Sequence, residues 1–183
     1  ATTTARPTPK ERRAAGKSLR SAVPLDAHAQ FARTASSRDP VELLEEQGAT
    51  RVPDLLPIRY GRMLQSPFAF YRGAARVMAA DLATTPTSDL AVQLCGDAHL
   101  SNFGTYASPE RRLVFDVNDF DETLPGPWEW DVKRLATSME VAGRDNGFSA
   151  KERADIVLST VSAYRTSRPR SRAGTCWSSC AAT

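Results

Sequence analysis

Apolar side chains recur at three- and four-residue steps in the first half of the chain, which predicts amphipathic helices. The first helix covers residues 40–48, with Asp39 as its N-cap and proline in its first turn. A broken helix is expected over residues 53–65, and Ser66 begins a longer helix over residues 67–82. One apolar stripe of this longer helix faces the core; it consists of Phe68, Tyr71, Ala75, Met78, Ala79 and Leu82.

From Leu90 onward the helical steps give way to short apolar runs of strand composition. Residues 90–95 form the first run. Residues 103–106 and 113–117 form two more, and the polar turn between them predicts a β-hairpin.

Helical periodicity returns in two later segments. The first covers residues 128–142, after a Pro-Gly-Pro sequence, and is expected to end at Gly143. The second begins at the cap residue Ser149 and buries Ile156, Val157, Val161 and Tyr164. The pattern therefore predicts an α+β fold, mainly helical, with a small β-hairpin or short sheet.

Composition divides the chain into three parts. Residues 1–24 are rich in Thr, Pro, Arg and Ala with little periodicity, which predicts a basic, partly disordered arm. Residues 25–164 form the expected domain. Apolar periodicity disappears after Tyr164, so residues 165–183 are expected to be a disordered or non-native tail.

The overall composition excludes several classes of protein. The 183 residues are 41% hydrophobic and 25% charged, which excludes a wholly disordered or fibrous chain. The longest apolar runs are only a few residues, so no membrane partner is expected. Three cysteines are too few for a disulfide scaffold and indicate a reducing, cytoplasmic location.

The net charge of +3 is unevenly distributed. The two ends are basic, with +5 over residues 1–20 and +4 over residues 165–183, so the remainder carries −6. Residues 96–131 alone account for that −6. This distribution of charge argues against nucleic acid as a partner of the globular part. It also indicates that any chemistry carried by carboxylates lies within residues 96–131.

The acidic stretch begins with a glycine turn that precedes Asp97 and, five positions later, Asn102. An Asp placed by a tight turn can accept the proton of an attacking hydroxyl, and an amide oxygen can ligate Mg²⁺. Asp119 and Asp121 follow the predicted hairpin, which would fold them back beside the loop as metal ligands. His99 is expected to shape the loop by hydrogen bonding.

Asp131 lies at the expected start of the next helix, in the sequence Trp-Asp-Val-Lys-Arg-Leu-Ala. We expect its carboxylate to cap that helix and to brace the loop that carries Asp97.

These motifs carry two resemblances. The Gly-Asp-x-His-x-x-Asn loop, the Asp-Phe-Asp sequence and the Asp131 segment resemble aminoglycoside-phosphotransferase-like and protein-kinase-like enzymes. The stretch 16–164 resembles more closely the bacterial family called domain of unknown function 2252, through four phrases. These are Arg-Tyr-Gly-Arg-Met from residue 59, Ser-Pro-Phe-Ala-Phe-Tyr-Arg-Gly from residue 66, Gly-Asp-Ala-His from residue 96, and Asn-Asp-Phe-Asp-Glu from residue 118.

The resemblance implies a domain like the kinase C-lobe that uses Mg²⁺ and ATP to phosphorylate a hydroxyl, on a small molecule or another acceptor. It assigns Asp97 as the catalytic base and Asn102 and Asp119 as metal ligands. Asp121 is a second candidate ligand, and Asp116 a weaker one.

The chain also departs from the kinase pattern. It contains no G-x-G pair, and none of its lysines (Lys10, Lys17, Lys133 and Lys151) lies in a predicted strand that could hold nucleotide phosphates. In the resembled family the Gly-rich segment and strand lysine lie further toward the C-terminus. We therefore expect an incomplete, truncated copy that is poorly active or inactive alone.

Two other functions stay open at this point. One is a non-catalytic binding module or fold remnant, whose basic arm would contact nucleic acid only through a salt-sensitive, sequence-independent interaction. The other is a metallophosphoesterase, which is less favoured because such sites need several histidines and the chain has only His28 and His99.

Overall fold

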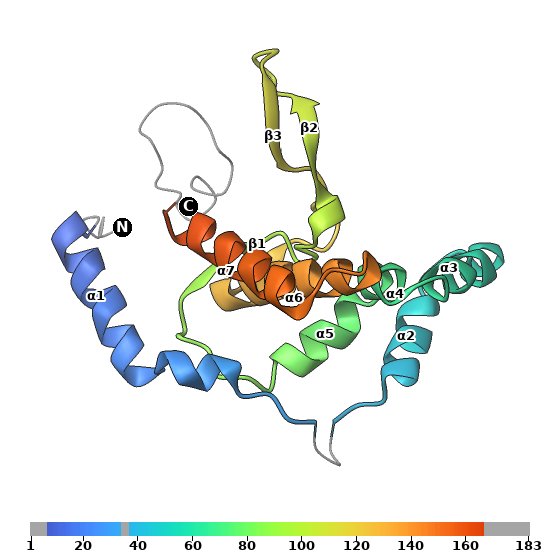
Figure 1. Cartoon of the computed structure of the whole chain (residues 1–183), viewed down its shortest axis with the longest axis horizontal. Coiled ribbons are helices and arrows are strands. Elements are labelled where there is room, and N and C mark those ends of the chain that lie inside the picture. Colours follow the sequence, from blue (N-terminus) through green and yellow to red (C-terminus); the bar gives the residue numbers. More distant parts are fainter. Residues whose placement is uncertain (1–6, 34–36, 167–183) are drawn as a thin grey trace, which may run out of the picture.

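The computed structural model describes residues 7–33 and 37–166, and it is an α+β structure. The central helix, α6 (Trp128–Asp145), packs against three other helices and one of two small antiparallel sheets, while the first helix lies apart from it (Figure 1). None of the helices in the described part is long and apolar enough to span a membrane.

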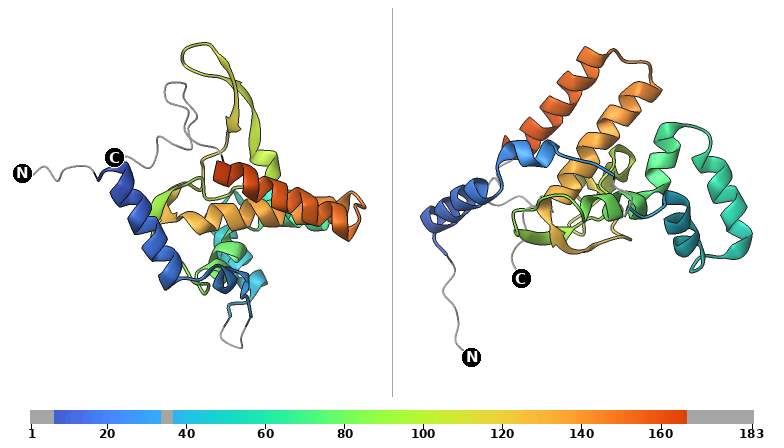
Figure 2. Two further views of the ribbon diagram at one scale, coloured as in Figure 1. Left: turned by 60° about the vertical axis from the view of Figure 1, so that its left-hand side comes forward. Right: turned by 90° about the horizontal axis from the view of Figure 1, so that it is seen from below.

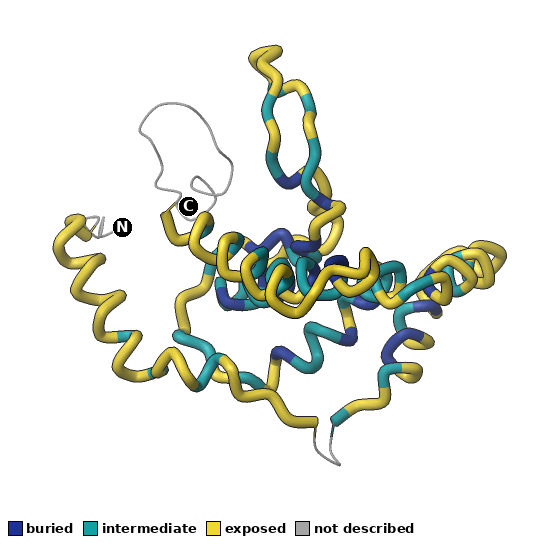
Figure 3. The backbone as a smooth tube through the Cα atoms, in the orientation of Figure 1, coloured by how far each residue is buried: buried dark blue, intermediate teal, exposed yellow. Residues whose placement is uncertain are grey.

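The first helix, α1 (Pro9–Ala22), lies within the segment expected to be an arm. Thr8 caps it and Glu11 bonds back to the Thr8 amide, so a complete capping box begins the helix. None of its residues is buried, and Figure 3 shows it almost wholly exposed. A short 3-10 turn, η1 (Leu25–Ala29), follows it.

The predicted helix after Asp39 is confirmed as α2 (Pro40–Gly48), and Asp39 accepts hydrogen bonds from the first-turn amides. The predicted broken helix is also confirmed, as the 3-10 turn η2 (Pro53–Leu55) followed by α3 (Leu56–Met63). Residues of α2, α3 and the segment after α3 form one hydrophobic core. Its buried members are Leu43, Leu44, Met63, Ala74 and Val77.

The expected long helix over residues 67–82 is wrong, because the chain forms two helices instead, α4 (Pro67–Gly73) and α5 (Ala75–Leu82). The break lies at Ala74, whose backbone leaves the helical region at φ −114° and ψ 34°. Gly73 allows a close approach there, since a Cβ at this position would lie 2.6 Å from the Met63 sulfur. The freed Gly73 carbonyl accepts a hydrogen bond from Arg59 at 2.6 Å.

The predicted hairpin is confirmed by β2 (Phe103–Ala107) and β3 (Leu113–Val117), which pair antiparallel. A 3-10 turn, η3 (Leu100–Asn102), precedes β2. The hairpin stands away from the helical body (Figure 1). Its base is buried, because Val117 packs with Cys95 and Ala98 in a second small core.

The predicted first strand is β1 (Ala91–Leu94), but its partner was not expected from the sequence. This partner is β4 (Leu124–Pro127), which includes the Pro-Gly-Pro sequence and pairs antiparallel with β1. Proline is tolerated because every strand of a two-stranded sheet is an edge strand. Gly126 is required for packing, since a Cβ there would lie 2.6 Å from Leu94 Cδ1.

The two longest helices, α6 (Trp128–Asp145) and α7 (Ala150–Thr166), lie side by side in both views of Figure 2. The helix expected to stop at Gly143 continues through it, and a turn at Gly147 with φ +73° follows. Near the other end of the pair, the rings of Trp128 and Tyr164 stack with centroids 6.2 Å apart. Beyond Thr166, the expected tail lies outside the described residues.

Candidate functional site

The loop that follows β1 is fixed by its own backbone and by helix α6. Gly96 has φ +88°, which favours glycine, and a Cβ there would lie 2.0 Å from the Glu122 carbonyl oxygen. Asp131 accepts hydrogen bonds from the amides of Cys95 at 2.8 Å and Gly96 at 3.2 Å. Asp131 therefore holds the main chain immediately before Asp97.

The expectation that Asp131 also caps its helix is wrong. The N-cap of α6 is Pro127, four residues before Asp131, and no side chain caps this helix. Asp131 lies in the first full turn and turns toward the loop instead. Burial raises the pKa of this carboxyl above its ordinary value, although the two amide hydrogen bonds act in the opposite direction.

Asp97 is held by a residue that was missing from the expected site, Arg134. The Arg134 Nε atom lies 2.5 Å from Asp97 Oδ1, and a second guanidinium nitrogen contacts the same oxygen. The Arg134 side chain is 3% exposed and that of Asp97 is 17% exposed. A largely buried ion pair thus sets the direction of the Asp97 carboxylate.

Arg134 is itself held by Tyr71 on α4. Its guanidinium donates to the Tyr71 carbonyl at 2.9 Å and lies 4.4 Å from the centre of the Tyr71 ring. In return, the Tyr71 hydroxyl donates to the Arg134 carbonyl at 2.7 Å. Burial is the main cause that raises the pKa of Tyr71 to about 12, so this hydroxyl stays protonated.

His99 is 3% exposed, and its Nε2 atom lies 3.6 Å from Asp97 Oδ2. Burial lowers the pKa of the imidazole, and the nearby charge of Arg134 lowers it further, while the charges of Asp97 and Asp119 raise it. The imidazole is therefore neutral at neutral pH.

Asn102 is buried at the end of the same loop. Its side-chain amide donates to the Asp97 carbonyl at 2.9 Å, which ties the two ends of the loop together. Ser138 of α6, fully buried, accepts from the Leu100 amide at 3.1 Å and holds the middle of the loop. The amide oxygen of Asn102 makes no hydrogen bond to the described residues, so the side chain is held through its nitrogen alone.

The segment after the hairpin returns to this loop. The Asn118 amide donates to the Asn102 carbonyl at 3.0 Å, and the Thr123 hydroxyl donates to the Leu94 carbonyl at 2.6 Å. These bonds place Asp119 one residue from a direct main-chain contact with Asn102. The main chain thus returns to the end of the loop, while the role of Asp119 and Asp121 as metal ligands stays a prediction.

The remaining expected carboxylates take different places. Asp119 and Asp121 are both exposed, and Asp119 accepts from the Asp121 amide at 3.2 Å. Asp116 lies on β3 opposite Gly104 and accepts from the Val117 amide. Within residues 7–33 and 37–166, no three His, Cys, Asp or Glu side chains are arranged to hold a metal ion.

Two further arginines interact electrostatically with residues of the loop. Arg59 of α3 interacts electrostatically with Asp97 and Glu122, and burial lowers the pKa of its guanidinium. Arg72 of α4 is exposed, and its positive charge contributes to the lowered pKa of His99. The acidic loop therefore faces cationic side chains from α3, α4 and α6.

A family model described as an uncharacterized protein conserved in bacteria (DUF2252) matches residues 51–174, more than half of the chain. The chain belongs to the DUF2252 family. The match includes the Asp97 loop, the hairpin and Asp131, and it leaves out α1 and α2. It ends inside the segment 165–183 for which the sequence predicts a tail. No curated protein and no solved structure matches the chain.

Proposed function

We propose that the Asp97 loop of this DUF2252 protein is the site of a Mg²⁺-dependent phosphotransferase, which transfers a phosphoryl group from a nucleoside triphosphate to a hydroxyl. One observation carries the proposal: the main-chain hydrogen bond from Asn118 to Asn102. It brings an acid that follows a hairpin beside a loop that carries both an Asp and an amide. Phosphotransfer needs these groups together, because it depends on positioning and charge neutralisation.

Asn102 and Asp119 would hold the metal ion. Both offer oxygen, which Mg²⁺ prefers, and Mg²⁺ sites use one or two protein ligands together with waters and substrate phosphates. The absence of a larger cluster of His, Cys, Asp and Glu among the described residues favours such a site over a zinc or two-metal centre. A bound Mg²⁺ would neutralise charge on the phosphates.

Asp97 would accept the proton of the attacking hydroxyl. Its Oδ1 atom is occupied by Arg134, so Oδ2 is the oxygen that faces away from the ion pair. Neutral His99 lies beside Oδ2 and adds no charge that would compete for the proton. Arg134 acts here as a positioning residue, because it fixes the carboxylate without contacting the acceptor.

The phosphates would be bound by arginine. The chain has no G-x-G loop, so backbone amides of such a loop cannot supply the contacts. Arg59 and Arg72 lie within electrostatic range of the loop, and guanidinium groups bind phosphate through two parallel hydrogen bonds. The histidine count supports this function over a phosphoesterase, since His28 lies in a separate cavity, away from His99.

Binding of Mn²⁺, a substitute for Mg²⁺ that is detected by electron paramagnetic resonance, tests the site directly. We expect one Mn²⁺ per chain whose affinity increases when ATP is added, and loss of this binding in Asp119→Asn. Asp155→Asn is the matched control, because it makes the same change on an exposed residue of α7. Unchanged Mn²⁺ binding in both Asp119→Asn and Asn102→Ala would contradict the proposal.

A further inference from the structure

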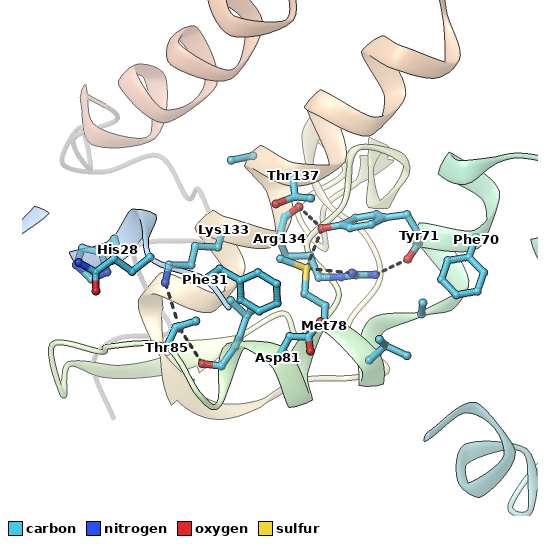
Figure 4. A pocket seen from close by; sticks show the side chains of 15 residues that line it. His28, Phe31, Phe70, Tyr71, Met78, Asp81, Thr85, Lys133, Arg134 and Thr137 are labelled. Atoms are coloured by element: carbon cyan, nitrogen blue, oxygen red, sulfur yellow. Dashed lines mark hydrogen bonds between the residues drawn. The ribbon is translucent and has the colours of Figure 1, made fainter. Parts of the chain in front are cut away.

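A cavity of about 480 Å³ is lined in part by Arg134, the residue that pairs with Asp97. Its lining residues come from three separate stretches of the chain: residues 28–31, residues 70–85 across α4 and α5, and residues 133–137 of α6. Figure 4 shows its side chains. The volume falls in the range of pockets that enclose small molecules, about 300–1,000 Å³.

Most of the cavity wall is apolar. The side chains that form this part are Phe31, which follows η1, Phe70 and Tyr71 of α4, and Val77, Met78 and Leu82 of α5. Phe31 and Phe70 are still partly exposed to solvent, with 56% and 40% of their surface accessible. Aromatic side chains left open on a concave surface gain free energy when an apolar ligand covers them.

The cavity has one polar end. In Figure 4, Lys133 and Thr85 lie toward the His28 side, whereas Phe70 and Tyr71 lie at the opposite side. The Lys133 ammonium donates to the Thr85 hydroxyl at 3.1 Å. No carboxylate of the described residues forms an ion pair with it, although the charge of Glu129, four residues earlier on α6, acts on it from a longer distance.

The other charged groups of the wall are already paired. Asp81 lies 3.7 Å from Arg33, and Arg134 is engaged by Asp97. Lys133 is therefore the cation of this wall that remains for a ligand. His28 contributes a second polar group, because its Nδ1 atom is buried without a hydrogen-bond partner in the described structure.

We propose that this cavity binds a small amphipathic monocarboxylate, with its carboxylate at Lys133 and its aromatic or aliphatic body against Phe31, Phe70 and Met78. A single ammonium neutralises one negative charge, which suits a carboxylate. A phosphate monoester carries more charge and is usually bound by arginine forks or several donors. The proposal does not depend on the phosphotransferase function, since none of its contacts uses Asp97, Asn102 or Asp119.

The test compares three probes that share one apolar body: 4-phenylbutyrate, 4-phenylbutan-1-ol and 4-phenylbutylamine. Binding to the full chain is measured by titration calorimetry and by saturation-transfer NMR. We expect saturable binding of the carboxylate and an affinity about tenfold lower for the alcohol, because it lacks the charge-assisted bond to Lys133. The amine should bind most weakly.

Variants then assign the two ends of the ligand. Lys133→Met keeps the apolar stem and should remove the preference for carboxylate over alcohol, while Lys151→Met on the exposed face of α7 should leave it unchanged. Phe31→Ala should weaken both probes, since it removes part of the apolar wall. If circular dichroism shows that Lys133→Met does not fold, the three probes measured on the unmodified chain and on Phe31→Ala still test the proposal.

Three results would overturn the proposal: no saturable binding of 4-phenylbutyrate, equal affinity for the alcohol and the carboxylate, or a carboxylate preference that survives in folded Lys133→Met.

Discussion

Replacing Arg134 with methionine should strongly destabilise the fold, because this side chain compensates a carboxylate that is mostly withdrawn from water. Methionine preserves most of the apolar volume, so the variant mainly removes charge and hydrogen bonds. It leaves Asp97 without its partner and the Tyr71 carbonyl without its donor. Breaking a buried ion pair by removing one member costs about 3–5 kcal/mol, and loss of the contact with the Tyr71 ring adds about 1 kcal/mol.

A double-mutant cycle isolates the ion pair from these other losses. Asp97→Asn in the normal background breaks the pair, whereas in the Arg134→Met background it removes an uncompensated charge. We therefore expect the second substitution to be neutral or stabilising, with a coupling energy of about 2–3 kcal/mol between the two sites. Urea unfolding followed by circular dichroism at 222 nm gives the four free energies of unfolding.

An exposed pair supplies the control. Arg144 and Glu140 lie 2.7 Å apart on α6, but the arginine is 67% exposed, so water and salt screen the interaction. The same cycle on Arg144→Met and Glu140→Gln should show no coupling beyond experimental error. If the Asp97–Arg134 coupling is equally small, the Asp97 carboxylate is solvated and Arg134 does not position it.

Three further predictions concern the same loop. Burial raises the pKa of Asp131 in the folded chain above its unfolded value, so its protonated form is favoured by folding. The free energy of unfolding of the unmodified chain, relative to that of Asp131→Asn, should therefore fall as the pH rises. The fall begins at the unfolded pKa of about 3.9, continues through the raised folded pKa and then levels off. Urea titrations that show a rise over this window would contradict the assignment. Gly96→Ala and Gly147→Ala both force alanine to positive φ, which costs about 1–2 kcal/mol, but only Gly96 would also place a Cβ 2.0 Å from the Glu122 carbonyl oxygen. Thermal unfolding should show a clearly larger loss for Gly96→Ala, and equal losses would mean that Glu122 moves aside freely. Burial raises the pKa of the Cys95 thiol to about 12, so iodoacetamide at pH 8 should modify Cys95 at least a hundredfold more slowly in the folded chain than in urea. Peptide mass spectrometry follows this residue separately, and equal rates would show that the loop opens readily.

The parts of the fold that the sequence predicted correctly are those with strong local signals. Asp39 and Pro40 define the start of α2 through side-chain capping and a fixed backbone angle, and neither depends on tertiary contacts. The β2–β3 hairpin follows from two apolar runs joined by a short polar turn. The acid after the hairpin returns to the loop because an antiparallel pair brings the ends of its strands together.

The errors have tertiary causes, except for one. Continuous apolar periodicity over residues 67–82 hid the break at Ala74, because Gly73 must let Met63 approach and only the packed structure shows this. Likewise, β4 is a Pro-Gly-Pro segment that becomes a strand only through pairing with β1. The exception is α1, a very polar helix with no buried residue, although its capping box at Thr8 and Glu11 was present in the sequence.

Arg134 was missed for a different reason. An arginine on a helix is solvated in most proteins, and nothing in a single sequence marks the one that turns inward. The informative feature is its spacing from Asp131: residues three apart lie on the same face of α6, and that face packs against the loop. Asp131 then holds the amides of Cys95 and Gly96, while Arg134 holds the Asp97 side chain.

This arrangement separates two supports of the proposed site. Helix α6 fixes Asp97 through Asp131, Arg134 and Ser138, whereas the hairpin delivers Asp119 through the main-chain bond between Asn118 and Asn102. A change on α6 should therefore disturb Asp97, the proposed proton acceptor, before it disturbs the proposed metal ligands. A change at the base of the hairpin, such as the replacement of buried Val117, should act in the reverse order. Because the loop is already held by protein groups on both sides, little reorganisation is needed when charge develops there, and this preorganisation is what electrostatic catalysis of phosphoryl transfer requires.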